Sequence, residues 1–180
     1  MIAQRLMTPR ILWAALLFST LMLGVLPYVA TLPDQPPNPI LLPVFGAVAL
    51  GQVVLGLVFP ETAMRKSLAT RLTKLIVERP NPAAEVTFRE AAPPIKAFDD
   101  PNVVWPQVFM IWQTSFILKM ALAESVGLMG LVLPFQGFPR EYTLPFVAVA
   151  VTLQIARFPT AAKIQAAVQK ATGVELPLPS

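Results

Sequence analysis

The stretch ILWAALLFSTLMLGVLPYVAT, residues 11–31, contains no charged residue and decides the class of this protein. A membrane-spanning helix needs about 20 predominantly apolar residues, because the hydrocarbon core is about 30 Å thick and a helix rises about 1.5 Å per residue. A second charge-free stretch, ILLPVFGAVALGQVVLGLVF, covers residues 40–59. We therefore predict two membrane-spanning helices in the first third of the chain.

Two further stretches extend this pattern. Residues 103–138 carry only two charges, Lys119 and Glu124, and residues 142–156 carry none before Arg157. The last stretch is short, but the long side chain of Arg157 can reach the headgroups from just inside the membrane. The predicted fold is an all-α polytopic membrane protein with four transmembrane helices, arranged as two tandem hairpins.

The composition supports a membrane protein and excludes much enzyme chemistry. Of the 180 residues, 55% are hydrophobic and 13% are charged, and the mean hydropathy is +0.62, whereas soluble domains have about 25% charged residues. The chain contains no Cys and no His, which removes disulfides, thiol nucleophiles, the usual zinc and haem ligands and an imidazole base. We expect no catalytic residues and no metal, with activity on a lipid or peptide as a minor alternative.

The N-terminus has two interpretations. Arg5 and Arg10 precede the first apolar run, as in a secretory signal peptide. A cut after Ala30 would place Tyr28 where a small side chain is needed, so we interpret the segment as a retained first helix.

The distribution of cations predicts the orientation, because Lys and Arg near the ends of spans are retained in the cytoplasm. The only charge in the first connection, residues 32–39, is Asp34. The second connection carries many cations: Arg65, Lys66, Arg71, Lys74, Arg79, Arg89 and Lys96. We therefore predict a multi-pass protein of the bacterial inner membrane with both termini in the cytoplasm. Its net charge of +4 is expected to mark this membrane face and not a nucleic-acid partner.

The second connection divides into a helical and a proline-rich part. Apolar residues recur at helical spacing from Glu61 to Arg79, which predicts a basic amphipathic helix. This helix either lies on the inner leaflet, with cations toward anionic lipid, or packs on its own protein. The lipid-facing cations would be Arg65, Lys66, Arg71 and Lys74. The proline-rich part that follows is expected to hold a short extended segment around residues 86–88 and no second soluble core.

The tail after Thr160 is typical of a short Ala-rich helix that ends near Gly173 and is followed by a loose end. These features divide the chain into four parts. They are a first hairpin (1–60), a cytoplasmic connection (61–102), a second hairpin (103–159) and a cytoplasmic tail (160–180).

The two halves share a pattern that suggests an internal duplication. Leu26-Pro27-Tyr28 ends the first span, and Leu133-Pro134-Phe135 ends the third. In the second and fourth spans, Gln52 and Gln154 each stand nine residues after a Leu-Pro pair. A duplication would relate the hairpins by an axis along the membrane normal. The alternative is chance in a proline-rich sequence, because proline also favours helix ends.

Glu124 is the strongest candidate for a functional residue. It lies five residues, or about 7 Å, deeper than Lys119 in the third span, and an intramembrane carboxylate costs about 2.5–3.5 kcal/mol unless it is protonated, paired or functional. Gln52 and Gln154 are the predicted partners. Lys119 is a poorer partner because a separation of five residues places the two on different helix faces.

The segment ALAESVGLMGLV, residues 121–132, resembles the outer helix of the rotary ATPase proteolipid, the c subunit. In that family a carrier Glu is followed by a small residue and, six positions on, by Gly-Leu-Val; here these are Glu124, Ser125 and residues 130–132. The resemblance implies that Glu124 binds H⁺ or Na⁺, and that Leu17 or Phe18 replaces a lost acid in the first half.

The resemblance covers a small part of the chain. The Gly-rich inner helix of proteolipids is not reproduced, because the second span has only Gly46, Gly51 and Gly56. The long second connection also stands where proteolipids have a short polar turn. A similar segment is typical of uncharacterised bacterial four-helix membrane proteins, which would imply descent without rotary function.

Small residues one turn apart let membrane helices approach closely. Ala47 with Gly51, and Ala123 with Gly127 and Gly130, are candidates for such packing, either within the chain or at a dimer interface. The sequence as a whole predicts a non-catalytic accessory or scaffold subunit of a membrane complex. Its partners would be membrane lipids and other membrane subunits or a second copy. The alternative is a proteolipid-like element that carries H⁺ or Na⁺, with annular lipid and no other cofactor.

Overall fold

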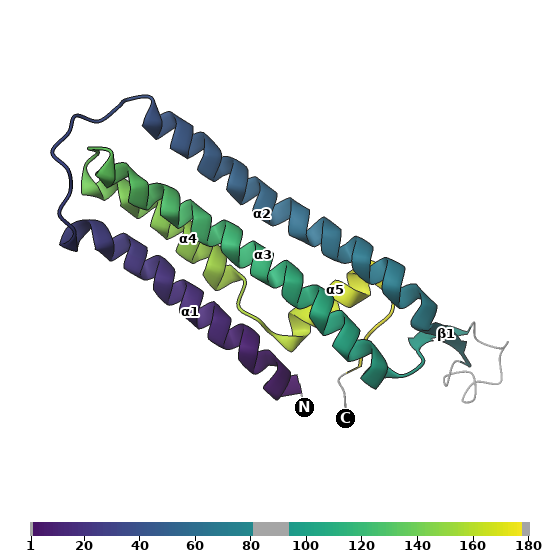
Figure 1. The fold of residues 1–180 in the computed structure, drawn as a ribbon. Helices are drawn as coiled ribbons and strands as arrows, with labels where there is room; N and C mark the ends of the chain where they lie inside the picture. The colour runs from purple at the N-terminus through teal and green to yellow at the C-terminus, as the bar shows by residue number, and fades with distance from the viewer. Residues whose placement is uncertain (1, 81–93, 178–180) are drawn as a thin grey trace.

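A computed structural model describes residues 2–80 and 94–177 (Figure 1). Its helices are α1 (Ile2–Val29), α2 (Leu41–Leu72), α3 (Pro101–Phe135), α4 (Thr143–Ala156) and α5 (Ala161–Thr172), with 3-10 turns at Thr73–Leu75 and Arg140–Tyr142 and strands β1 (Ile76–Arg79) and β2 (Ile95–Phe98). Three helices are long and apolar enough to cross a membrane, or four if α4 and α5, which are bent by 79°, form one span. The prediction of a mostly helical membrane protein is therefore confirmed at this level.

The helices form an elongated bundle with α3 at its centre. α1 packs against α3 and α4, and α2 packs against α3 and α5. In Figure 1, α1 and α2 consequently lie on opposite sides of α3, while α4 lies beside it. In the second predicted hairpin, α3 and α4 pack against each other. In the first, α1 and α2 are separated, because they lie on either side of the second hairpin.

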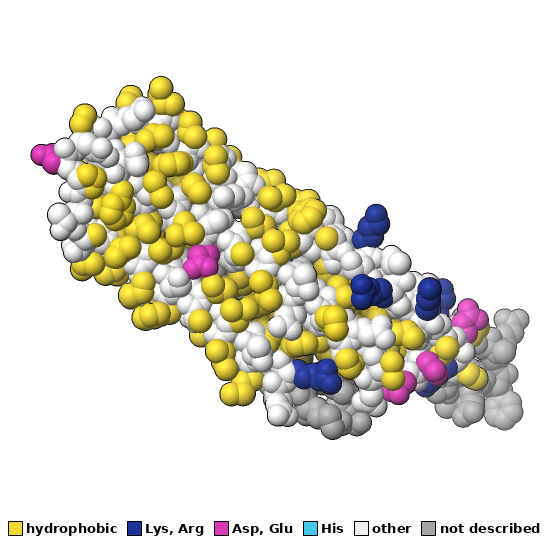
Figure 2. All heavy atoms as spheres, in the orientation of Figure 1, with side chains coloured by type: hydrophobic (Ala, Val, Ile, Leu, Met, Phe, Trp, Pro, Cys, Tyr) yellow, Lys and Arg dark blue, Asp and Glu magenta, His cyan; other side chains and the backbone are white. Residues whose placement is uncertain are grey.

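The bundle has two halves of different character. We call the apolar half the part that contains residues 11–59 and 120–156, whose only charged residues are Asp34, Glu124, Arg140 and Glu141. We call the basic half the part that contains α1 before Ile11, α2 from Glu61, α3 up to Lys119, the β1–β2 hairpin, α5 and the residues after it. Hydrophobic side chains cover much of the apolar half in Figure 2, and the Lys and Arg side chains on this face gather toward the basic half.

α2 continues without a break from the apolar half into the basic half. We predicted a separate amphipathic helix from Glu61, but the helix runs through Pro60 to Leu72, so the predicted boundary at residue 60 falls inside α2. Its apolar stripe does not lie on lipid, because Met64, Leu68 and Leu72 are buried within the protein. The alternative we left open, packing on the protein itself, describes this segment.

The predicted helix also ends early. After the 3-10 turn, the chain forms β1, which pairs antiparallel with β2, so that Ile76 lies opposite Phe98 and Arg79 opposite Ile95. β-Branched residues begin β1, and Phe98 places its ring in the core with 3% exposure, which favours strand over helix here. The extended segment expected around residues 86–88 lies outside the described residues.

The basic half contains a hydrophobic core that we did not predict. Its buried residues come from α1, α2, β2, α3, α5 and the tail, and Met120 joins them from just beyond Lys119: Leu6, Met64, Leu68, Leu72, Phe98, Val104, Trp105, Val108, Trp112, Phe116, Met120, Ile164, Ala167, Val168, Val174 and Leu176. The tail is part of this core and not a loose end, since Trp105 Nε1 donates to the Pro177 carbonyl at 2.7 Å. The tail helix itself matches the prediction, with Thr160 as N-cap and left-handed Gly173 at its C-terminus.

Candidate functional site

A layer of polar side chains crosses the apolar half, and each of its four helices contributes to it. The layer consists of Ser19 and Thr20 from α1, Gln52 from α2, Glu124 and Ser125 from α3, and Gln154 from α4, joined in three hydrogen-bonded pairs. In an apolar environment each such group needs a partner, because an unpaired polar group there is costly.

Glu124 is paired with α1 and not with a glutamine. The Ser19 hydroxyl donates to Glu124 Oε1 at 2.7 Å, and the Glu124 side chain is partly exposed at the surface of the isolated chain. Gln52 instead accepts from the Ser125 hydroxyl at 3.0 Å. The structure thus places the predicted residues in one layer, but their hydrogen bonds within the described chain go to hydroxyl groups. The sequence could have indicated Ser19 as a member of this layer only because it is a polar residue within a charge-free run.

Gln154 is fully buried in the same layer. Its Nε2 donates to Thr20 Oγ1 at 2.7 Å, and its backbone carbonyl accepts from Trp13 Nε1 at 2.8 Å. Its Oε1 has no hydrogen-bond partner among the described residues. Gln52 and Gln154, which occupy matching places in the two halves of the sequence, thus make matching contacts. Each bonds to a hydroxyl on the first helix of the opposite half.

Two helix prolines are accommodated by donors from α4 and from the residue that follows it. Pro60 has no N–H for the Gly56 carbonyl four residues before it, and Arg157 Nη2 donates to that carbonyl at 3.3 Å. Pro134 likewise leaves the Gly130 carbonyl free, and the Thr143 hydroxyl donates to it at 3.0 Å. The glycine in each pair leaves its carbonyl open to the neighbouring helix. The first donor explains why α2 continues past Pro60, where a proline would otherwise end or kink the helix. α3 ends at Phe135, one residue after Pro134.

The predicted packing residues fall into an inner and an outer group. Ala123, Gly127 and Gly130 are buried on α3, and a Cβ at Gly130 would lie 2.5 Å from Phe146 Cβ on α4. Gly51 faces open space with nothing within 4 Å of an added Cβ. With Ala47 it lines an apolar hollow of about 690 Å³ on the outer side of α2.

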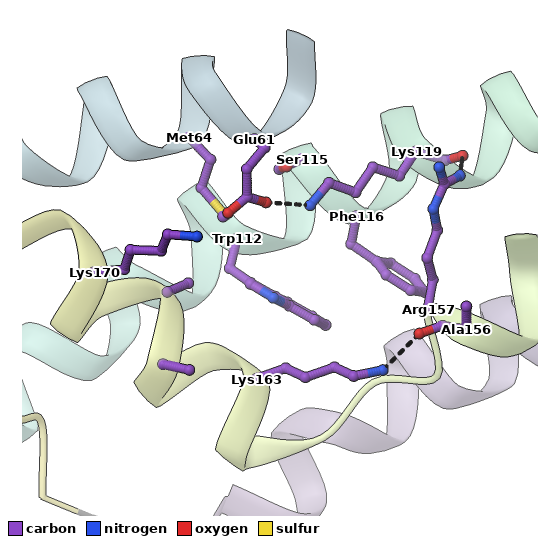
Figure 3. Close-up of a pocket in the computed structure, with 12 residues that line it drawn as sticks. Glu61, Met64, Trp112, Ser115, Phe116, Lys119, Ala156, Arg157, Lys163 and Lys170 are labelled. Atoms are coloured by element: carbon purple, nitrogen blue, oxygen red, sulfur yellow. Dashed lines mark hydrogen bonds and ion pairs between the residues drawn. The ribbon is translucent and has the colours of Figure 1, made fainter. Parts of the chain in front are cut away.

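A cavity of about 340 Å³ lies where the apolar half meets the basic half (Figure 3). Its charged lining comes from Glu61 on α2, Lys119 on α3, Arg157 after α4, and Lys163 and Lys170 on α5. Lys119 Nζ lies 2.7 Å from Glu61 Oε2, and Arg157 Nη1 donates to the Lys119 carbonyl. Sequence reasoning missed this cavity, because the 79° bend between α4 and α5 brings its cations together.

The four predicted lipid-facing cations do not lie in one plane. Arg65 pairs with Glu61 one turn away at 3.4 Å, and Lys66, Arg71 and Lys74 are exposed. Lys74 lies in the 3-10 turn after α2, roughly 20 Å farther along this segment than Phe59. Of the four cations, Arg65 and Lys66 are therefore the nearest to the end of the apolar half.

The described residues contain no metal-binding cluster, and the comparisons with known proteins give no match. Among residues 2–80 and 94–177, no group of three or more His, Cys, Asp or Glu side chains could hold a metal ion. No family model, curated protein or solved structure matches the chain. The functional argument therefore rests on the geometry alone.

Proposed function

We propose that this chain is a non-catalytic scaffold or accessory subunit of a larger complex in the cytoplasmic membrane of a bacterium. In this proposal the basic half and both termini lie on the cytoplasmic side. The gathering of cations at one end of the bundle supports this orientation, because Lys and Arg near spans are retained in the cytoplasm.

The observation that carries the proposal is the poor burial of two long helices. Only 11% of the residues in the most apolar part of α1 and of α2 are buried, compared with 39% in α3. Because α1 and α2 lie on opposite sides of α3, each presents a long apolar face to its surroundings. The α2 face is hollowed around Ala47 and Gly51, and small residues allow the close approach of another membrane helix.

The test is purification of the tagged full-length chain from its native membranes in a mild detergent. We expect a partner, or a second copy, in a fixed ratio to the chain. Gly51→Leu fills the hollow and should release that partner. Gly46→Leu is the comparison variant, because Gly46 also faces open space on α2 but lines a different hollow, the one that α2 forms with α3 and α4. A lone monomer, or equal loss from both variants, would contradict the proposal.

A second function is favoured by the Ser19–Glu124 hydrogen bond. It leaves one Glu124 oxygen available beside a polar layer, and the carboxylate is only partly buried. A carboxylate with hydroxyl and amide groups nearby could bind H⁺ or Na⁺, as the proteolipid resemblance implies. Labelling of the purified chain with a hydrophobic carbodiimide tests this. Modification of Glu124 that Na⁺ or high pH suppresses is expected, whereas no labelling at any pH would exclude ion carriage.

A further inference from the structure

The cavity between α2, α3 and the α4–α5 bend carries an excess of positive charge. Lys119, Arg157, Lys163 and Lys170 line it, and Glu61 is the one carboxylate in its lining. Lys119 is held by Glu61, and Lys163 Nζ donates to the carbonyls of Ala156 and Phe158 at 2.8 and 2.9 Å. Arg157, Lys163 and Lys170 therefore have no carboxylate partner in the cavity lining.

The four cations keep hydrogen-bond donors for a ligand. An ammonium group has three N–H donors and a guanidinium has five. Lys163 uses two of them and Arg157 uses two, both on backbone carbonyls. Lys170 has no hydrogen bond or ion pair with the described residues, and Figure 3 shows its ammonium extended into the cavity toward Glu61. A compact anion could thus be contacted from α3, α5 and the bend at once.

The other wall of the cavity is aromatic. Trp112 and Phe116 stack with ring centroids 5.2 Å apart, and both line the cavity. Glu61 lies just after the charge-free run of residues 40–59 on α2, and Lys119 on α3 pairs with it at this level. A ligand here would therefore meet apolar surface on one side and cations on the other, at the depth where lipid headgroups begin.

We propose that this cavity binds a phosphate group, held by Lys119, Arg157, Lys163 and Lys170. Phosphate suits the site because guanidinium and ammonium groups form short, charge-assisted hydrogen bonds to its oxygens. The position and the aromatic wall favour the phosphate of an anionic phospholipid from the cytoplasmic leaflet, a choice of source that rests on the proposed membrane orientation. A free phosphate offers the same chemistry, so the experiment separates the two.

The test measures thermal unfolding of the full chain in a neutral detergent. One arm adds phosphatidylglycerol, with phosphatidylcholine as the reference lipid, and the other adds inorganic phosphate without lipid. A ligand that binds the folded state raises the unfolding midpoint with concentration, which yields an apparent Kd. A rise with phosphatidylglycerol alone identifies a lipid phosphate, and a rise with inorganic phosphate alone identifies a free one.

Lys170→Gln tests the assignment to the cavity. Its side chain is exposed and bonds to no described residue, so we expect the variant to fold like the original chain. We expect binding about fivefold weaker, the effect of one cation near an anionic surface, and retention of binding in Lys170→Arg. Lys66→Gln is the matched control, an exposed lysine outside the cavity. Equal weakening in both Gln variants, or no midpoint rise in either arm, would overturn the proposal.

Discussion

The apolar and basic halves of the bundle share α1, α2 and α3 but are held together differently. In the basic half, a single cluster of sixteen buried hydrophobic residues joins α1, α2, α3, α5 and the tail. In the apolar half, the corresponding cluster contains only Ala49, Val126 and Ala150. Other close contacts there are polar or involve glycine, as with Gln154 and Thr20 or Gly130 and Phe146.

The difference is the one expected if, as proposed, the apolar half lies in a bilayer and the basic half in water. Burial of apolar side chains is favourable when it removes them from water. Lipid tails are as apolar as leucine, so helices within a bilayer associate through close packing and hydrogen bonds instead. The two halves therefore offer a direct comparison of these forces within one chain.

The largest effect should come from the basic half. Leu68 is fully buried, whereas Leu50 on the same helix is 65% exposed in the apolar half. We expect Leu68→Ala to lower the free energy of unfolding by about 2–5 kcal/mol, because it leaves a cavity. Leu50→Ala should change it by less than about 0.5 kcal/mol. Denaturant unfolding in mixed micelles measures both, and similar losses would mean that water does not stabilise the two halves differently.

A smaller loss is expected where α3 and α4 approach closely. A Cβ at Gly130 would lie 2.5 Å from Phe146 Cβ and 3.0 Å from the Thr143 carbonyl. Gly130→Ala should therefore destabilise the chain by about 1–3 kcal/mol through overpacking. At Gly46 nothing lies within 4 Å of an added Cβ, so Gly46→Ala should be neutral or slightly stabilising, as expected for a helix interior. The same unfolding assay distinguishes them, and a neutral Gly130→Ala would mean that this contact is loose.

The spans could be predicted from the sequence because bilayer thickness sets the length of an apolar run directly. Residues 11–31 and 40–59 both lie largely within helices of the structure. The continuation of α2 through Pro60 could not be predicted from the sequence, because a proline ordinarily ends or kinks a helix. Its tolerance here depends on Arg157, about a hundred residues away in sequence, which bonds to the Gly56 carbonyl.

The site was predictable only in part for the same reason. The cost of an intramembrane carboxylate singled out Glu124, but the choice of Ser19 over Gln52 as its partner depends on how α1 packs against α3. The hydrophobic core of the basic half was missed because its residues are spread over elements that meet only in the folded chain. The spacing of apolar residues in 61–76 predicted an apolar helix face, but the sequence did not indicate which elements pack against that face.

The smallest effect tests the polar contacts of the apolar half. The Thr143 hydroxyl bonds to the Gly130 carbonyl, which has no N–H donor within its helix because of Pro134. We expect Thr143→Val to cost about 1 kcal/mol. In a Pro134→Ala background a backbone N–H returns at position 134, so the cost should fall by at least about half, as coupled sites in a double-mutant cycle do.

Thr152 provides the control for this cycle. Its hydroxyl also bonds to a backbone carbonyl, that of Ala148 at 2.8 Å, but within its own helix and at an exposed position. Thr152→Val should therefore have little effect in either background, because no proline removes the N–H partner of that carbonyl. If the cost of Thr143→Val is the same with and without Pro134, then the hydroxyl does not replace the missing donor. The helical backbone around Pro134, at the end of α3, would then need packing, and not hydrogen bonding, as its cause.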